Sequence, residues 1–200
     1  MRAFMILTAA ALLSAASGLA LADDYEAGGV TFEPTITVQS EDGEHELRCT
    51  GTALRKKWFF KVYAAAAYLD VGTESGDDAG AMFVDADAPK RLHLQMLRDV
   101  DSEKIVSSID DAFEKCATTP LDRIATDREN FREIFSMEKL LKGQDIRFTW
   151  MPGVGLQISV DDDPLGTIAS PEFGNSFFEI YFGPEPVTEG MKEDLLEQVS

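Results

Sequence analysis

The chain has 200 residues, which suits one medium-sized domain and leaves no room for two ordinary ones. Hydrophobic residues make up 44% of it and aromatic residues 10%, so we expect a packed core and exclude general disorder. Thirty-six acidic residues against 18 basic ones give a net charge of −18, which makes nucleic acid and anionic membranes poor partners for the body as a whole. Two cysteines and two histidines exclude a disulfide-dense scaffold and an all-histidine metal site.

The first 22 residues have the pattern of a secretory signal peptide. After a short basic start, residues 3–21 are almost wholly small or apolar, and residues 20–22 give the A-x-A pattern before an acidic pair. A membrane anchor is the alternative, but it is disfavoured because the run is alanine-rich and no basic cluster follows it. We predict cleavage after Ala22, a mature domain over residues 23–200, a periplasmic location, and no stable membrane insertion after cleavage.

The next part of the chain has the alternating pattern of β-strands. Strands are predicted over residues 30–39, 45–54, 58–69 and 91–97. The turn signal Glu41-Asp42-Gly43 joins the first two. In the third strand Tyr63, Ala65 and Ala67 share one face, and Ala64 and Ala66 the other. Residues 71–89 are rich in glycine and aspartate without a firm period, which indicates a loop or a mobile hairpin.

The remaining residues mix helices with strands. Helices are predicted from Asp101 or Ser102 to Cys116, from Thr119-Pro120 past Phe135, through Leu140 and Leu141, over residues 171–182, and over residues 192–198. A hairpin is predicted from residues 145–151 and 155–160 around Pro152-Gly153, followed by a short strand over residues 165–168. Because strands and helices do not alternate regularly, the fold class is α+β rather than doubly wound.

Standard catalytic and cofactor motifs are missing from the sequence. It has no G-x-S-x-G, no Walker loop, no dinucleotide fingerprint and no H-E-x-x-H, and neither His45 nor His93 stands beside a plausible nucleophile. The acidic run over residues 161–163 indicates a charged turn rather than a calcium loop. Cys49 and Cys116 are interpreted as buried thiols, with a disulfide as the alternative. We therefore predict no catalytic residue, no metal and no cofactor.

Residues 55–63 (RKKWFFKVY) depart from the acidic background. Four of the 18 cations fall within residues 55–61. Arg55 offers a planar fork that matches a carboxylate, Tyr63 offers a directional hydroxyl, and the small side chains of residues 64–67 would leave room for a hydrocarbon tail. The alternative, favoured by composition alone, is that the lysines guard a strand edge and Arg55 pairs with an internal acid.

Residues 51–63 (GTALRKKWFFKVY), running on to residues 67–70 (AYLD), resemble the opening motif of the chalcone isomerase-like family, in particular its exported bacterial branch. Further matching pieces follow in order at residues 97–100 (LRDV), 142–145 (KGQD), 152–155 (PGVG), 165–168 (LGTI) and 173–184. The resemblance implies an open-faced β-sandwich, with a large antiparallel sheet and helices packed on one face.

The resemblance also suggests roles for three residues. The plant enzymes of this family cyclise chalcones with an arginine, a threonine and a later tyrosine, whereas other members bind fatty acids through an arginine and a tyrosine. Arg55 matches the arginine, and Tyr63 falls where the enzymes have threonine and the fatty-acid binders tyrosine. Asp101 stands where the catalytic tyrosine is expected, and because a carboxylate cannot replace a phenol, isomerase activity is disfavoured.

The sequence thus predicts a non-enzymatic, monomeric periplasmic protein that binds a fatty acid or a similar small amphipathic carboxylate through Arg55 and Tyr63. An isomerase or lyase for a phenolic or enone substrate is one alternative, and a structural or partner-binding envelope protein is another. The binding prediction carries a condition. An unbroken strand would separate Arg55 from Tyr63 by roughly 26 Å, at about 3.3 Å per residue, so the chain must turn or bulge near Lys56-Lys57.

Overall fold

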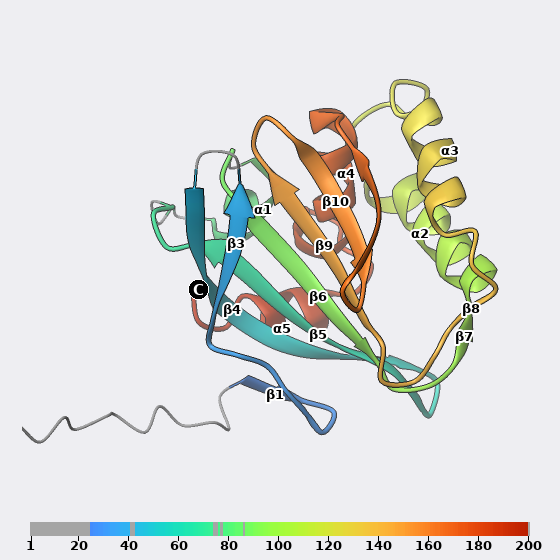
Figure 1. Ribbon diagram of the computed structural model, residues 1–200, viewed down its shortest axis with the longest axis horizontal. Helices are drawn as coiled ribbons and strands as arrows, with labels where there is room; N and C mark the ends of the chain where they lie inside the picture. The colour runs from blue at the N-terminus through green and yellow to red at the C-terminus, as the bar shows by residue number, and fades with distance from the viewer. Residues whose placement is uncertain (1–24, 41–42, 74–75, 77, 86, 200) are drawn as a thin grey trace, which may run out of the picture.

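A computed structural model describes residues 25–40, 43–73, 76, 78–85 and 87–199 (Figure 1). The predicted signal peptide and two residues of the Glu41-Asp42-Gly43 turn lie outside the described residues. The described part forms a curled antiparallel sheet of seven strands with five helices packed on it, which confirms the predicted α+β class. Among the described residues, none of the helices combines the length and apolar character needed to cross a bilayer.

The strands of the main sheet follow the order β11-β10-β9-β6-β5-β4-β3, and each neighbouring pair is antiparallel. Their bounds are Thr35–Ser40 (β3), Gly43–Lys57 (β4), Phe60–Asp70 (β5), Lys90–Met96 (β6), Asp145–Met151 (β9), Gly155–Val160 (β10) and Asp163–Ile168 (β11). The alternation predicted along β5 is confirmed, since Ala65 and Ala67 face the helices while Ala64 and Ala66 face the other side.

The helices cover one face of the sheet. They span Ala79–Asp85 (α1), Ser102–Cys116 (α2), Ala125–Ile134 (α3), Pro171–Phe182 (α4) and Glu189–Leu195 (α5). The central one, α4, begins where Ser170 accepts a hydrogen bond from the backbone N–H of Phe173 and a proline takes the first helical position. Its Phe173, Phe177 and Phe178 side chains are completely buried, so this helix anchors the core between the layers.

A small second core covers the other face. The short strands Glu26–Ala27 (β1) and Val30–Thr31 (β2) form an N-terminal hairpin, and Phe32 packs with sheet residues such as Leu47 and Tyr68. Cys49 belongs to this core, whereas Cys116 belongs to the core on the helical side. Both are free, buried thiols, which confirms the favoured interpretation, and burial raises the pKa of Cys49 to about 12.

Two predicted assignments, one strand and one helix, are corrected. Residues 30–39 form β2 and β3 rather than one strand, and the break falls at Pro34, whose ring removes a backbone donor. The predicted helix through Leu140 and Leu141 is absent, because Lys139–Leu140 (β8) instead pairs with Val100–Asp101 (β7). Leu140 is fully buried in that arrangement, so tertiary burial overrides its helix propensity.

Two helix assignments are also corrected. The segment 71–89, predicted as a loop or a mobile hairpin, contains α1, which is held in place because Phe83 stacks on Phe182 of α4 with ring centroids 4.1 Å apart. The helix predicted to start at Thr119-Pro120 begins only at Ala125. Turns occupy the intervening residues, including a hydrogen bond from the Arg123 N–H to the Pro120 carbonyl.

Candidate functional site

The strands β4 and β5 are joined by a tight turn at Trp58 and Phe59, so the chain does turn beyond Lys57. Trp58 is therefore a turn residue, and the strand predicted to begin there begins at Phe60. As a result Arg55 lies directly opposite Tyr63 in the strand register, and the condition on their separation is met. Residues in such a pair have Cβ atoms about 5 Å apart, close enough to bind one ligand.

A β-bulge follows this pair. The register shifts between Arg55 and Lys56, because Val62 has no counterpart on β4. A bulge increases strand twist and redirects the side chains beside it. Both Val62 and Tyr63 consequently line the same cavity, although neighbours in a regular strand point to opposite faces.

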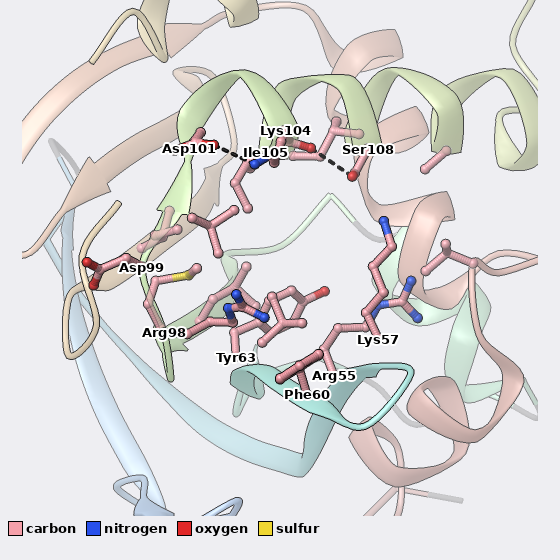
Figure 2. Close-up of a pocket in the computed structure, with 18 of the residues that line it drawn as sticks. Arg55, Lys57, Phe60, Tyr63, Arg98, Asp99, Asp101, Lys104, Ile105 and Ser108 are labelled. Atoms are coloured by element: carbon pink, nitrogen blue, oxygen red, sulfur yellow. Dashed lines mark hydrogen bonds and ion pairs between the residues drawn. The ribbon is translucent and has the colours of Figure 1, made fainter. Parts of the chain in front are cut away.

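The cavity has a volume of about 580 Å³ and lies between the sheet and α2. Figure 2 shows Lys104 and Ile105 of α2 on one side of it, and Arg55 and Tyr63 from the β4–β5 hairpin on the other. Its apolar lining comes from the sheet (β6 and β9) and from the helices α2 and α4: Leu94, Met96, Ile105, Ile109, Ala112, Ile146, Phe148 and Ile180. A largely apolar hollow with polar groups gathered at one end is the usual form of a small-molecule site.

The Arg55 side chain is partly buried and carries an uncompensated charge. Its Nη1 atom donates to the Thr188 hydroxyl at 2.5 Å, where Thr188 is the N-cap residue of α5. Within the part of the chain that the structure describes, no carboxylate lies within ion-pairing distance of Arg55, so the alternative of a pairing with an internal acid is wrong there. The guanidinium is held by a neutral group and keeps donors for an anion.

Tyr63 hydrogen-bonds to Tyr181, which α4 places on the other side of the cavity end. Burial raises the pKa of both phenols above the ordinary value of 10, and the charge of Arg55 opposes that shift. Both hydroxyls therefore stay protonated at neutral pH, and since the bond between them uses one O–H, the other O–H is available to donate to a ligand. The sequence indicated only that Ile180 or Tyr181 faces inward. The role of Tyr181 could have been inferred because a tyrosine that faces inward needs a hydrogen-bond partner for its hydroxyl.

The charged residues around the cavity are mostly positive, whereas the chain as a whole is strongly negative. Five cations line it, namely Arg55, Lys57, Arg98, Lys104 and Lys139, against the two carboxylates of Asp99 and Asp101. Both carboxylates are already engaged, because Asp101 pairs with the Lys104 ammonium at 2.5 Å and Asp99 accepts the Lys142 backbone N–H at 2.9 Å. In a protein of net charge −18, this local excess of three positive charges attracts a small anion to one place.

The alanine run does not line the cavity as expected. Residues 64–67 are completely buried, two in the core beneath the helices and two in the core beneath the N-terminal hairpin, so they leave no room for a ligand tail. The room lies farther along, where Ala112 of α2 faces Leu94 and Phe148. The phenylalanines interpreted as ordinary core residues are confirmed as such: Phe113, Phe131, Phe135, Phe177 and Phe178.

Asp101 and the two histidines pair with other charged residues of the protein. Asp101 is the N-cap residue of α2, as predicted, and its ion pair lies at the rim of the cavity. His45 approaches Asp70 at 3.5 Å and His93 approaches Asp145 at 2.9 Å, and neither histidine lines the cavity. No cluster of histidine, cysteine and carboxylate groups among the described residues could hold a metal ion.

The fold is an open-faced α+β sandwich with a cavity between its sheet and the helix α2. A family model described as chalcone isomerase-like matches residues 24–197, and the chain belongs to the chalcone isomerase-like family. Among solved structures it is similar to a fatty-acid-binding protein of Arabidopsis thaliana, with 21% sequence identity and a TM-score of 0.65, over 86% of this chain and 93% of that one. No curated protein sequence matches the chain significantly.

Proposed function

We propose that this protein binds a fatty acid or a similar small amphipathic carboxylate in the cavity and does not transform it. The observation that carries the proposal is the Arg55 guanidinium, which lies at the cavity, opposite Tyr63, with no carboxylate of the described residues within ion-pairing distance. The structural similarity to a protein named as a fatty-acid binder supports the same conclusion.

In the complex the ligand's carboxylate accepts hydrogen bonds from Arg55 and Tyr63. A guanidinium has five N–H donors, so the one used by Thr188 leaves others for a carboxylate fork. Tyr181 fixes the direction of the Tyr63 hydroxyl through their mutual hydrogen bond. Arg98 and Lys57, at the exposed rim, add attraction at longer range.

The hydrocarbon tail supplies most of the affinity. Each methylene that leaves water for the apolar lining contributes about 0.8 kcal/mol, so eight of them contribute about 6 kcal/mol before the costs of binding. The charged end then decides which amphiphiles bind and in which orientation. A volume of about 580 Å³ lies within the range usual for such ligands.

The two alternatives have less support. A structural protein with a filled core predicts no cavity continuous with Arg55, and the structure has one. An isomerase requires an acid–base group at the substrate, and at the position of the family's catalytic tyrosine stands Asp101, which is occupied by its ion pair with Lys104. Turnover of an enone that disappears in Arg55→Ala would favour the isomerase.

The proposed location is the periplasm, reached by cleavage after Ala22. Its support is the three-part pattern of the first 22 residues. Intact-mass measurement of the protein recovered from a periplasmic extract tests it, with a mature N-terminus at Asp23 as the expected result. An uncleaved chain in the cytoplasmic fraction would contradict it.

The binding proposal is tested by calorimetry with a series of fatty acids of increasing length. Affinity is expected to rise about fourfold with each added methylene that is buried, and to level off once the cavity is filled. Native mass spectrometry of the protein as purified should also show a bound lipid. No lipid on the purified protein and no heat of binding for any length would overturn the proposal.

A further inference from the structure

The tip of the β4–β5 hairpin exposes three consecutive aromatic side chains. Trp58, Phe59 and Phe60 are 86%, 96% and 62% exposed, more than the other large hydrophobic side chains that the structure describes as exposed. Lys56, Lys57 and Lys61 flank them, and all three lysines are exposed. Residues 56–61, hereafter the hairpin tip, therefore combine aromatic rings and positive charge with no carboxylate between them.

The backbone of the hairpin tip is also unusual. Trp58 adopts a φ of 61°, in the left-handed region that glycine occupies freely and bulky residues rarely do. Asp161 shares this region, but its carboxylate is fixed by the backbone N–H of Asp145 at 2.9 Å. The Trp58 ring is nearly all in water, so it gains little from packing that would offset the strain. A strained and exposed tryptophan of this kind indicates a role in an interaction.

We infer that the hairpin tip docks on the surface of an anionic lipid bilayer and presents the mouth of the cavity to it. Tryptophan and phenylalanine favour the interfacial region of a bilayer, and lysines beside them are attracted to anionic headgroups. A net charge of −18 repels the rest of the protein from the same surface. The opposed charges orient the molecule with the hairpin tip toward the lipid.

The cavity and the hairpin tip are continuous. Lys57, Trp58 and Phe60 belong to both, and the Arg98 guanidinium at the mouth lies 5.0 Å from the centroid of the Phe60 ring. A docked hairpin therefore places the entrance at the depth where the carboxylate of an amphiphile lies in a membrane. The use of this entrance to exchange a ligand with the membrane rests on the proposed function. Docking itself does not rest on it.

The test uses the two tryptophans of the mature protein and vesicles without fatty acid. Trp150 is 6% exposed and serves as an internal reference, whereas Trp58 reports on the hairpin tip. Emission of the wild type is expected to shift to shorter wavelength with vesicles of phosphatidylcholine and phosphatidylglycerol, but little with phosphatidylcholine alone. Trp58→Phe should abolish the shift, and added salt should weaken it.

Two further variants separate docking from ligand binding. Phe59 and Lys56 do not line the cavity, so Phe59→Ser and Lys56→Glu should each weaken vesicle binding about fivefold or more and leave the calorimetric affinity for free fatty acid unchanged. Val154→Ser, at the exposed turn of the β9–β10 hairpin, is the matched control and should bind vesicles like the wild type.

The outcomes are distinguishable. If the wild type ignores anionic vesicles, or if its hairpin tip instead mediates self-association that Phe59→Ser abolishes, the docking inference is overturned whatever calorimetry shows. If the wild type binds fatty acid without vesicles but Phe59→Ser docks as well as the wild type, the proposed function stands and the inference falls. If vesicles bind as expected and no fatty acid does, docking stands and the carboxylate proposal falls.

Discussion

The hydroxyls of Tyr63 and Tyr181 hydrogen-bond to each other in the lining of the cavity, one from the sheet and one from the helix packed on it. Tyr181 is 5% exposed, so its buried hydroxyl depends on Tyr63 for a hydrogen-bond partner. The pair ties the two layers together beside Arg55, one of the five cations that line the cavity.

Removal of both hydroxyls is expected to cost less than the sum of the two single removals. Tyr63→Phe leaves the buried Tyr181 hydroxyl unpaired, which should lower the free energy of unfolding by about 1–3 kcal/mol, and Tyr181→Phe should act likewise. The double variant leaves no orphan, so its loss should be smaller than the sum of the two. Chemical denaturation of the four proteins measures this coupling, and strictly additive losses would show that the hydroxyls do not depend on each other.

Gly51 should prove irreplaceable because α5 approaches the backbone of β4 there. A Cβ at this position would lie 2.1 Å from the Asp194 carbonyl oxygen, so α5, whose N-cap residue is Thr188, would have to move. We expect Gly51→Ala to cost about 1–3 kcal/mol of stability and to weaken carboxylate binding, since Thr188 holds Arg55.

The matched control for this effect is Gly190→Ala in α5 itself. A Cβ at Gly190 meets nothing within 4 Å, and alanine favours a helix, so this variant should be neutral or up to about 1 kcal/mol more stable. Thermal unfolding of the two variants compares them directly. A Gly51→Ala protein as stable as Gly190→Ala would mean that α5 docks less closely than the structure indicates.

Stability should change with pH in a way that depends on Lys90. This residue is 1% exposed beneath the Phe178 ring, and burial lowers its pKa from 10.5 to about 8, against the opposing effect of Asp85 and Asp87. Because the unfolded chain holds the proton more tightly, the contribution of Lys90 to stability is complete above pH 10.5 and is lost as the pH falls toward 8.

The comparison that isolates this effect is the wild type against Lys90→Met, by denaturation at a series of pH values. The stability of the wild type relative to the variant should rise between pH 8 and 10.5, by up to about 3 kcal/mol. The thiol of Cys49 and the buried tyrosines, whose ordinary pKa values of 9.0 and 10.0 lie in the same interval, are common to both proteins. A difference that stays constant over the interval would show that Lys90 keeps an ordinary pKa.

Local signals in the sequence were enough for much of the fold. The proline at position 171, the inward phenylalanines and Gly183 predicted α4 over the same residues that the structure shows. The alternation of residues 63–67 predicted which side chains share a face of β5. In contrast, α1 depends on the stacking of Phe83 on Phe182, a contact between distant parts of the chain that no local pattern reveals.

The site was predicted only in part, for similar reasons. The residue types of Arg55 and Tyr63 indicated a carboxylate site, but their juxtaposition depends on a turn at Trp58-Phe59, which lacks the glycine, asparagine or proline that announces a hairpin. Thr188 and Tyr181 come from helices far along the chain. The small side chains of residues 64–67 suggested space for a ligand tail. The structure shows that other core residues fill this space.

The most direct test of the account is the calorimetric affinity for a long-chain fatty acid and for the alcohol of the same length, measured with wild type, Arg55→Gln and Arg48→Gln. Arg48 lies on the same strand and is exposed outside the cavity, which makes it the matched control. Arg55→Gln is predicted to lose about 10- to 150-fold in affinity for the acid and little for the alcohol, while Arg48→Gln binds both like the wild type. An Arg55→Gln protein that binds the acid as tightly as the wild type would contradict the account.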